Sequence, residues 1–272
     1  MVFCWRDELL LSTPLILRQQ LEAHSEPLAR KAAGSSRRMI WRAQPRNALS
    51  THHNRLELEE EIVMLLLITG ASGAGKSTAR VGTDRLLSDE IDAVELGHLG
   101  PIPPIPTTAW RQEMAEAAVR RAITLEAQGR HLLVAGDPIA AGEILAAPSA
   151  AKIDIAICLL DADSAAQTDR LRKRNEPEEY LVHHVAFADW MRHHATDPTH
   201  MPEVITTNGW ESMQWDRWTE LKSDDPRWAM TIIDTSKVLP EDVAEQVAQW
   251  CSDARHGSAP VFRKGWYYRD PA

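Results

Sequence analysis

A stretch of nine residues, Gly70 to Thr78, reads GASGAGKST and has the residue types of a phosphate-binding loop. It meets the pattern G-x-x-x-x-G-K-[ST] at each defined position, between an apolar run and a stretch of helical character. Glycine lets main-chain N–H groups approach a phosphate closely, and the following helix directs its positive end at the same anion. We expect Lys76 to act on the β- and γ-phosphates and the Ser77 hydroxyl to bind Mg²⁺. The loop therefore predicts ATP and Mg²⁺ as ligands, held by Gly70, Ala71, Ser72, Gly73, Ala74, Gly75, Lys76, Ser77 and Thr78.

Two carboxylates follow apolar, strand-like runs. Asp137 ends the run HLLVAGDP, at the edge where open α/β sheets place their ligands, and it could assist Mg²⁺ or orient a substrate hydroxyl. The alternative for Asp137 is an Asx turn before Pro138. Glu95 ends a shorter run and could accept the hydroxyl proton as phosphate transfers, although glutamates at strand ends are also commonly solvated. His98 competes with Glu95 for that role or contacts the substrate, with an ordinary surface histidine as the alternative.

A basic cluster lies in the stretch DRLRKR. Arg170 and Arg174 are four residues apart and hence on one helix face, with Arg172 and Lys173 at neighbouring positions. Such a cluster can neutralise the charge on a transferring phosphoryl group. The alternative is a solvated helix end whose cations favour the helix C-terminus. The catalytic candidates are thus Lys76, Glu95, Asp137, Arg170 and Arg174.

These residues must be positioned by a sheet, because from residue 62 onward strand-length apolar runs alternate with longer amphipathic stretches. This pattern predicts an α/β fold with a parallel sheet covered on both faces. The predicted strands are 63–69, 93–96, 131–135, 153–160 and 229–233. The predicted helices are 75–87, 108–128, 164–174 and 240–251, with Gly129 as a C-terminal cap for the second. The proline-rich segment 97–107 must be a loop.

Composition narrows the class of protein. The 272 residues suit one substantial domain, and a net charge of −9 argues against a general nucleic-acid or membrane-surface binder. Residues 18–55 nevertheless hold eight Arg or Lys against two Glu, so a basic arm for RNA is one interpretation of the N-terminal region. Three cysteines, Cys4, Cys158 and Cys251, fit no metal or redox spacing and suit a reducing cytoplasm. No run is long and apolar enough for a membrane span.

Three regions are expected. Residues 1–61 are predicted to form a weakly ordered N-terminal extension, because they contain little that could form a core. Residues 62–256 form the phosphate-loop domain, and residues 257–272 form a peripheral C-terminal tail.

The domain resembles the small-molecule and nucleotide kinases of the P-loop class, a group that contains shikimate, gluconate, adenylyl-sulfate and adenylate kinases. The resemblance rests on GASGAGKST, RLRKR and IIDTSKVLPEDVAEQV. It implies a three-layer fold with a five-stranded parallel sheet in the order 2-3-1-4-5 and a helical, mobile lid. It also implies that Arg170 and Arg174 clasp ATP and that the backbone of Asp234, Thr235 and Ser236 borders the base.

The sequence departs from this group in two segments. After the proline-rich loop, Arg111 is the candidate for gripping an anionic or polyhydroxyl acceptor, with a solvated arginine in a first helical turn as the alternative. An insertion at about 175–227 is rich in Trp and His. Its aromatic side chains could form an acceptor pocket or cover the core from outside. Its histidines could bind zinc, although their spacing and the lack of nearby cysteine favour ordinary surface residues.

These features predict an ATP-dependent phosphotransferase that transfers the γ-phosphate to a hydroxyl of a small metabolite, nucleoside or nucleotide. The chain has no LSGGQ-like signature of transporter ATPases and no NKxD-like guanine reader of GTPases. Two alternatives stay open: a regulatory nucleotide-binding ATPase without an acceptor, and a polynucleotide end kinase that uses the basic arm. The identity of the acceptor, the choice between ATP and GTP, and the oligomeric state are left open by the sequence.

Overall fold

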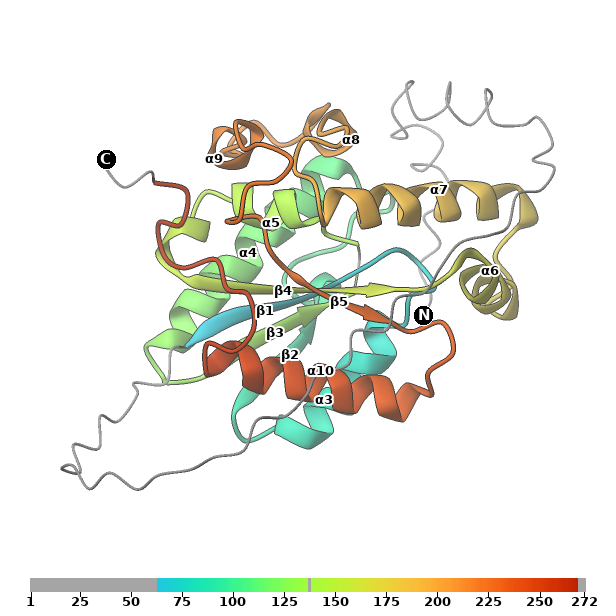
Figure 1. Cartoon of the computed structure of the whole chain (residues 1–272), viewed down its shortest axis with the longest axis horizontal. Coiled ribbons are helices and arrows are strands. Elements are labelled where there is room, and N and C mark those ends of the chain that lie inside the picture. The colour runs from blue at the N-terminus through green and yellow to red at the C-terminus, as the bar shows by residue number, and fades with distance from the viewer. Residues whose placement is uncertain (1–62, 137, 269–272) are drawn as a thin grey trace, which may run out of the picture.

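A five-stranded parallel sheet forms the centre of the protein, as a computed structural model that describes residues 63–136 and 138–268 shows (Figure 1). The strands stand in the order β2-β3-β1-β4-β5, and all four pairings are parallel. The predicted fold class, an α/β three-layer fold with strand order 2-3-1-4-5, is confirmed. The strands are β1 (Met64–Thr69), β2 (Ile91–Glu95), β3 (His131–Ala135), β4 (Asp154–Asp161) and β5 (Thr231–Asp234).

Helices cover both faces of this sheet. In Figure 1, α3 (Lys76–Leu87) and α10 (Pro240–Arg255) lie on one face, while α4 (Thr108–Glu126), α5 (Ala141–Ala146) and α7 (Glu178–His194) lie on the other. Alternate residues of a strand point to opposite faces, so Leu65 and Leu67 pack toward α4 and α5, and Leu66 and Ile68 pack toward α3 and α10. Burial on both faces explains why β1 is apolar at nearly every position.

The remaining helices are α6 (Ser164–Lys173), α8 (Glu203–Thr206) and α9 (Asp216–Thr219), with 3₁₀ turns η1 (Leu96–His98) and η2 (Ala150–Lys152). Helix α4 begins where predicted, because the Thr107 side chain accepts a hydrogen bond from the Trp110 N–H at 3.1 Å. After its end, Gly129 has a φ of +70°, as expected of a helix-ending glycine. Helix α10 runs four residues past its predicted end, and the predicted loop 97–107 begins inside η1.

The insertion at 175–227 is helical and contributes α7, α8 and α9. Trp190, Trp218 and Trp228 are buried in the same core cluster as β1 and β4. The indole N–H of Trp218 donates to the Gly142 carbonyl at 2.9 Å, and a Cβ at Gly142 would come within 2.5 Å of the Trp218 ring. Of the two interpretations of these aromatic residues, the structure supports the cover over the core.

His194 lies among these rings. It stacks on Trp190 with 4.8 Å between ring centroids, and Trp218 and Trp228 contact it edge-on. Burial lowers the pKa of His194 to about 3, so its imidazole is neutral near pH 7. Among the described residues, no group of three or more His, Cys, Asp or Glu side chains could hold a metal ion.

The described part of the C-terminal tail packs against the start of β4. Phe262 forms an antiparallel bridge with Ile155, while Arg263 and the Lys264 N–H bind the Asp154 carboxylate. The predicted N-terminal extension, residues 1–61, lies outside the described residues. None of the described helices combines the length and apolar character needed to cross a membrane.

Candidate active site

The phosphate loop joins the central strand β1 to α3, at the carboxyl edge of the sheet where crossovers leave to opposite sides. Gly70, Gly73 and Gly75 have φ values of +137°, +85° and +101°. Side chains with a Cβ rarely adopt this region, and a Cβ at Gly70 would also collide with the Leu160 carbonyl oxygen. The glycines at these positions are therefore required by the backbone path of the loop.

Five successive carbonyl oxygens of the loop, from Gly70 to Ala74, accept hydrogen bonds from side chains. Lys76 Nζ donates to Gly70 and Ala71, at 2.6 and 2.9 Å. The other three donors are Gln167 to Ser72 (2.8 Å), Arg170 to Gly73 (3.2 Å) and Thr235 to Ala74 (3.0 Å). In a trans peptide the N–H points away from the C=O, so fixing these carbonyls also fixes the direction of the N–H groups of the same peptides. One of them, the Ala74 N–H, donates to the Ala71 carbonyl at 3.2 Å within the loop.

The first turn of α3 adds further donors to this site. Gly75 stands at the N-cap position without a side chain that could cap the helix, so the first N–H groups of α3 are open to a ligand. Lys76 is buried next to them, whereas Ser77 and Thr78 are exposed at the surface. The arrangement fits a polyphosphate, since oriented N–H groups and one ammonium converge on the same place.

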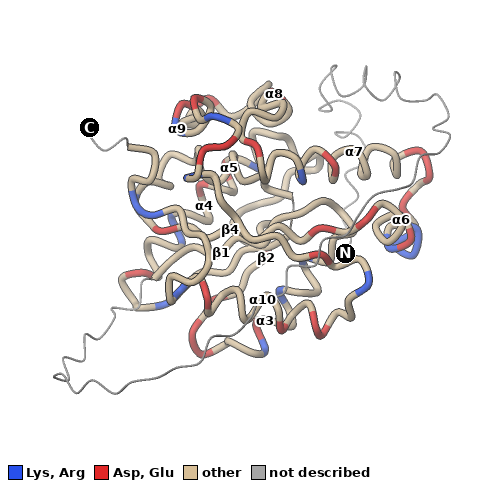
Figure 2. The backbone as a smooth tube through the Cα atoms, viewed as in Figure 1, with Lys and Arg blue, Asp and Glu red and all other residues tan. Residues whose placement is uncertain are grey.

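A cavity of about 270 Å³ adjoins the loop. It lies between α6 and the start of α10, and its lining includes Gly73, Thr78, Arg170, Arg174 and Val238. Helix α6 carries Arg170, Arg172 and Lys173 in its last turn, and Figure 2 shows blue Lys and Arg positions on this helix at one side of the molecule. The structure thus brings Arg170 and Arg174 to the edge of the phosphate loop, while their action on ATP stays a prediction.

Arg170 reaches the loop after β5 as well as the phosphate loop. It donates to Thr235 Oγ1 at 3.0 Å and to the Thr235 carbonyl, so one guanidinium joins both loops. Next to Thr235, the Ser236 hydroxyl and N–H both bond the Asp234 carboxylate and hold its pKa below the usual range. Asp234, Thr235 and Ser236 therefore form an ordered turn beside the cavity, in the place where the resemblance puts the nucleotide base.

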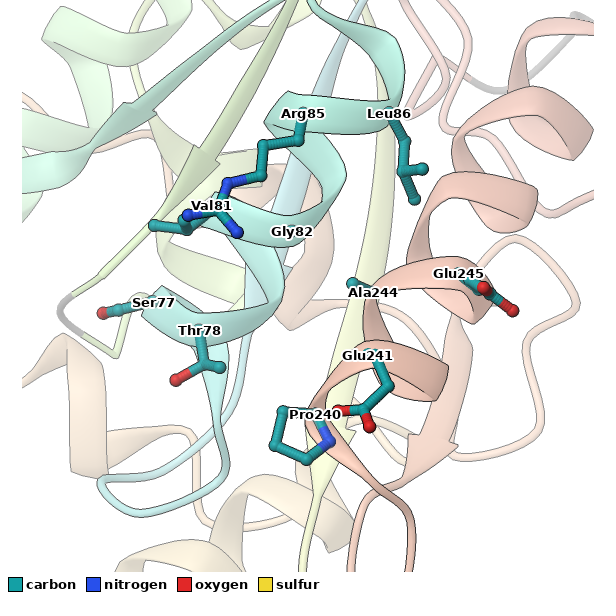
Figure 3. Close-up of a pocket in the computed structure, with 10 residues that line it drawn as sticks. All are labelled: Ser77, Thr78, Val81, Gly82, Arg85, Leu86, Pro240, Glu241, Ala244 and Glu245. Carbon is teal, nitrogen blue, oxygen red and sulfur yellow. The ribbon is translucent and has the colours of Figure 1, made fainter.

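A second, more open groove of about 710 Å³ lies between α3 and α10 (Figure 3). Thr78 and Pro240 line both this groove and the smaller cavity. Figure 3 shows that the Ser77 side chain points away from α10. Ser77, whose hydroxyl is predicted to bind Mg²⁺, lines the end of this groove together with Thr78.

Glu95, the candidate base, forms an ion pair that the sequence did not predict. Arg80 Nε donates to Glu95 Oε1 at 2.9 Å, and the two side chains are 16% and 22% exposed. Arg80 follows Lys76 by four residues and so lies one turn along the same helix face. That spacing was the available signal for Arg80, but the sequence did not indicate its partner.

Arg111 is buried and forms an ion pair with Glu143. Its Nε lies 3.0 and 3.1 Å from the two carboxylate oxygens of Glu143, and its Nη2 lies 2.6 Å from Oε1. The alternative of a solvated arginine is wrong, because Arg111 is buried, and the pair with Glu143 already uses the guanidinium expected to grip an acceptor. Glu143 was not singled out in the sequence, and it also accepts from the Ala140 N–H at 2.9 Å.

Two predicted site residues remain, His98 and Asp137. His98 is exposed in η1, at the end of the segment that carries Glu95. Asp137, predicted to hold Mg²⁺, lies outside the described residues. The structure therefore brings together the phosphate loop, Arg170, Arg174 and Thr235, and it pairs Glu95 with Arg80 of α3.

No protein-family model matches the sequence, and no curated protein matches it. Some solved structures are similar in fold. A sugar kinase from a Janibacter species is 15% identical with a TM-score of 0.41, covering 71% of this chain and 97% of its own. Shikimate kinase from Acinetobacter baumannii, solved with shikimate, is 15% identical with a TM-score of 0.39, covering 71% and 96%. An uncharacterized protein from Eubacterium ventriosum is 13% identical with a TM-score of 0.39, covering 70% and 98%. Similarity this weak carries no argument about activity.

Proposed function

We propose that this protein is an ATP- and Mg²⁺-dependent phosphotransferase that acts on a hydroxyl of a small metabolite or nucleoside. The observation that carries the proposal is the phosphate loop, whose carbonyls are held by hydrogen bonds from Lys76, Gln167, Arg170 and Thr235. A loop supported in this way has its N–H groups oriented before an anion arrives, which is the condition for strong electrostatic stabilisation.

Each residue has a role in the proposed reaction. The N–H groups from Gly70 to Thr78 bind the phosphates, Lys76 neutralises the β- and γ-phosphates, and Arg170 and Arg174 clasp the nucleotide from α6. Ser77 and Asp137 would hold Mg²⁺, which when bound neutralises charge on the phosphate oxygens. The acceptor oxygen forms a bond to the γ-phosphorus while the bond to the β-phosphate oxygen breaks, and the hydroxyl proton passes to the Glu95 carboxylate.

Calorimetry and a product assay test the proposal. Full-length protein is titrated with ATP in the presence of Mg²⁺, and ADP release is then followed with a panel of sugars, cyclitols and nucleosides. ATP binding together with acceptor-dependent ADP release is expected. Absence of heat with adenine or guanine nucleotides would contradict the nucleotide site, and ATP binding without any acceptor effect would instead support the regulatory ATPase.

The same assay tests whether the protein is a polynucleotide end kinase. An RNA oligonucleotide with a free 5′-hydroxyl is included, and the assay is repeated on a variant that lacks residues 1–61. The polynucleotide end kinase is excluded if the RNA is not phosphorylated. It is also excluded if the affinity of the protein for the RNA does not change when residues 1–61 are removed.

A further inference from the structure

We infer that the acceptor is an uncharged polyhydroxyl compound, such as a sugar, cyclitol or nucleoside, and not a carboxylated or phosphorylated one. This inference rests on the proposed phosphotransferase and adds the charge class of its acceptor. It comes from two ion pairs, Arg80 with Glu95 and Arg111 with Glu143, on one side of the phosphate loop.

The two pairs involve the elements that follow the carboxyl ends of β2 and β3. Glu95 ends β2, and residues 96–107 lead from there to the first turn of α4, which carries Arg111. Residues 136–140 lead from β3 to α5, which carries Glu143. We call this region the acceptor side, because a substrate next to the γ-phosphate must bind where the candidate base Glu95 stands.

The Arg111 guanidinium is held in a buried ion pair with Glu143. The guanidinium binds both carboxylate oxygens, and the side chains of Arg111 and Glu143 are 9% and 0% exposed. Gln112 Nε2 adds a bond to Glu143 Oε1 at 3.1 Å, and its carbonyl oxygen accepts the Trp210 N–H at 2.6 Å. Drawing Arg111 toward an anionic acceptor would leave Glu143 as an uncompensated buried charge, which proteins avoid.

The positive charge of Arg80 is likewise balanced, by the carboxylate of Glu95. It donates to Glu95 and, through Nη1, to the Ala93 carbonyl at 3.4 Å. This pairing uses Glu95 Oε1 and leaves Oε2 as an acceptor that suits a hydroxyl donor. Because Arg80 is already paired with Glu95, it offers little attraction to a carboxylate or phosphate on the acceptor, whereas a neutral hydroxyl can donate to Glu95 Oε2.

The described segment that joins β2 to α4 adds no Lys or Arg to this side, since residues 96–107 contain neither. Helix α6 and the residue after it, by contrast, place Arg170, Lys173 and Arg174 in the lining of the nucleotide cavity. Arg172 and Lys173 of α6 are paired with Glu178 and Asp169. Arg170 instead donates to carbonyl and hydroxyl oxygens, so its positive charge is not cancelled by a carboxylate in these contacts, unlike that of Arg80 and Arg111.

Matched acceptors test the inference on the unmodified full-length protein. Each neutral compound is paired with an anionic counterpart: glucitol with gluconate, glucose with glucose 6-phosphate, and adenosine with AMP. We expect kcat/KM for ADP release to be at least about tenfold higher for the neutral member of each productive pair. If the anionic members are preferred while ATP is still consumed in an acceptor-dependent way, the inference is wrong and the phosphotransferase stands. If neither class is phosphorylated, both are wrong.

A variant gives a second test. Glu143→Gln removes the charge that neutralises Arg111, so the ratio of neutral to anionic kcat/KM should fall by about tenfold. Glu126→Gln is the matched control, because it removes a carboxylate that pairs with Lys264 at the far end of α4, and it should leave the ratio unchanged. An unchanged ratio in folded Glu143→Gln overturns the role given to this pair. If Glu143→Gln does not fold, the comparison on the unmodified protein decides.

Discussion

Gly136 lies against the carboxylate of Glu95, so closely that a Cβ at position 136 would come within 2.5 Å of Glu95 Oε2. Its φ of +110° is a second reason for glycine at this place. Gly136 and Glu95 are 41 positions apart in the sequence, and they are in close contact at the carboxyl edge of the sheet.

Gly136→Ala should displace Glu95 and lower kcat by about 100-fold, because catalytic groups tolerate little misplacement. The control is Gly129→Ala, whose φ is also positive at +70° but whose Cβ would meet open space. That variant should lose only about 1 kcal/mol of stability and keep its kcat. Steady-state kinetics and thermal unfolding check both variants, and equal loss of kcat in the two would argue against the role of Glu95.

Lys76→Ala should reduce turnover by at least about 100-fold, since it removes the cation next to the transferring phosphate. Lys152→Ala is the matched control, because Lys152 is exposed in η2 at the opposite end of β4. ADP release under saturating ATP is the measurement. Near-normal rates for Lys76→Ala would contradict the assignment of the phosphate loop.

Thr235→Val should weaken ATP binding without changing the charge of the site. The Thr235 hydroxyl lies 3.0 Å from the Ala74 carbonyl and 2.9 Å from the Asp161 carbonyl, so its loss frees one peptide of the phosphate loop. A net loss of about 1–2 kcal/mol corresponds to a roughly 5–30-fold higher Kd in calorimetry. Thr124→Val removes an exposed hydroxyl that bonds the Arg120 carbonyl, and its Kd should stay unchanged.

Asp137→Asn and Glu95→Gln should separate metal binding from base catalysis. Excess Mg²⁺ should restore much of the activity of Asp137→Asn, because the lost function is affinity for the ion. It should not restore Glu95→Gln, which loses the proton acceptor. Rates measured across a Mg²⁺ titration decide the point, and equal rescue of both variants would remove the distinction between their roles.

His194 should make the fold less stable in acid. Its pKa is about 3 in the folded protein because of burial, against 6.5 as the ordinary value. The unfolded chain binds the additional proton between these values, so the stability is full above about pH 6.5 and falls as the pH is lowered toward 3, by up to about 1.4 kcal/mol per pH unit.

His194→Phe should therefore flatten the fall of Tm between pH 6.5 and 4 while keeping the ring stacked on Trp190. His193→Phe, at the adjacent and largely exposed position, should leave that slope close to the original. If the slope of His194→Phe equals that of the unmodified protein, the buried imidazole does not titrate as described.

The phosphate loop and the central strands could be predicted because their signals are local. Residues 70–78 carry a complete motif between a strand and a helix, and β3 has the predicted bounds. Contacts between residues far apart in the sequence, and very short helices, could not be predicted. Arg111 meets Glu143 across 32 positions and Gln167 meets Ser72 across 95, and nothing in the intervening sequence specifies either contact. Helix α5 has only six residues, too few for a periodic pattern.

Because Trp218 packs against Gly142, the insertion is an integral part of the protein interior. Swinging α7 and α9 outward as a rigid flap would pull large aromatic rings out of the interior and wet the apolar side of β4. Any closure over a bound nucleotide must then come from smaller shifts of individual loops. For the same reason, residues 175–227 cannot be trimmed away to give a minimal domain, because the sheet would lose part of its own packing.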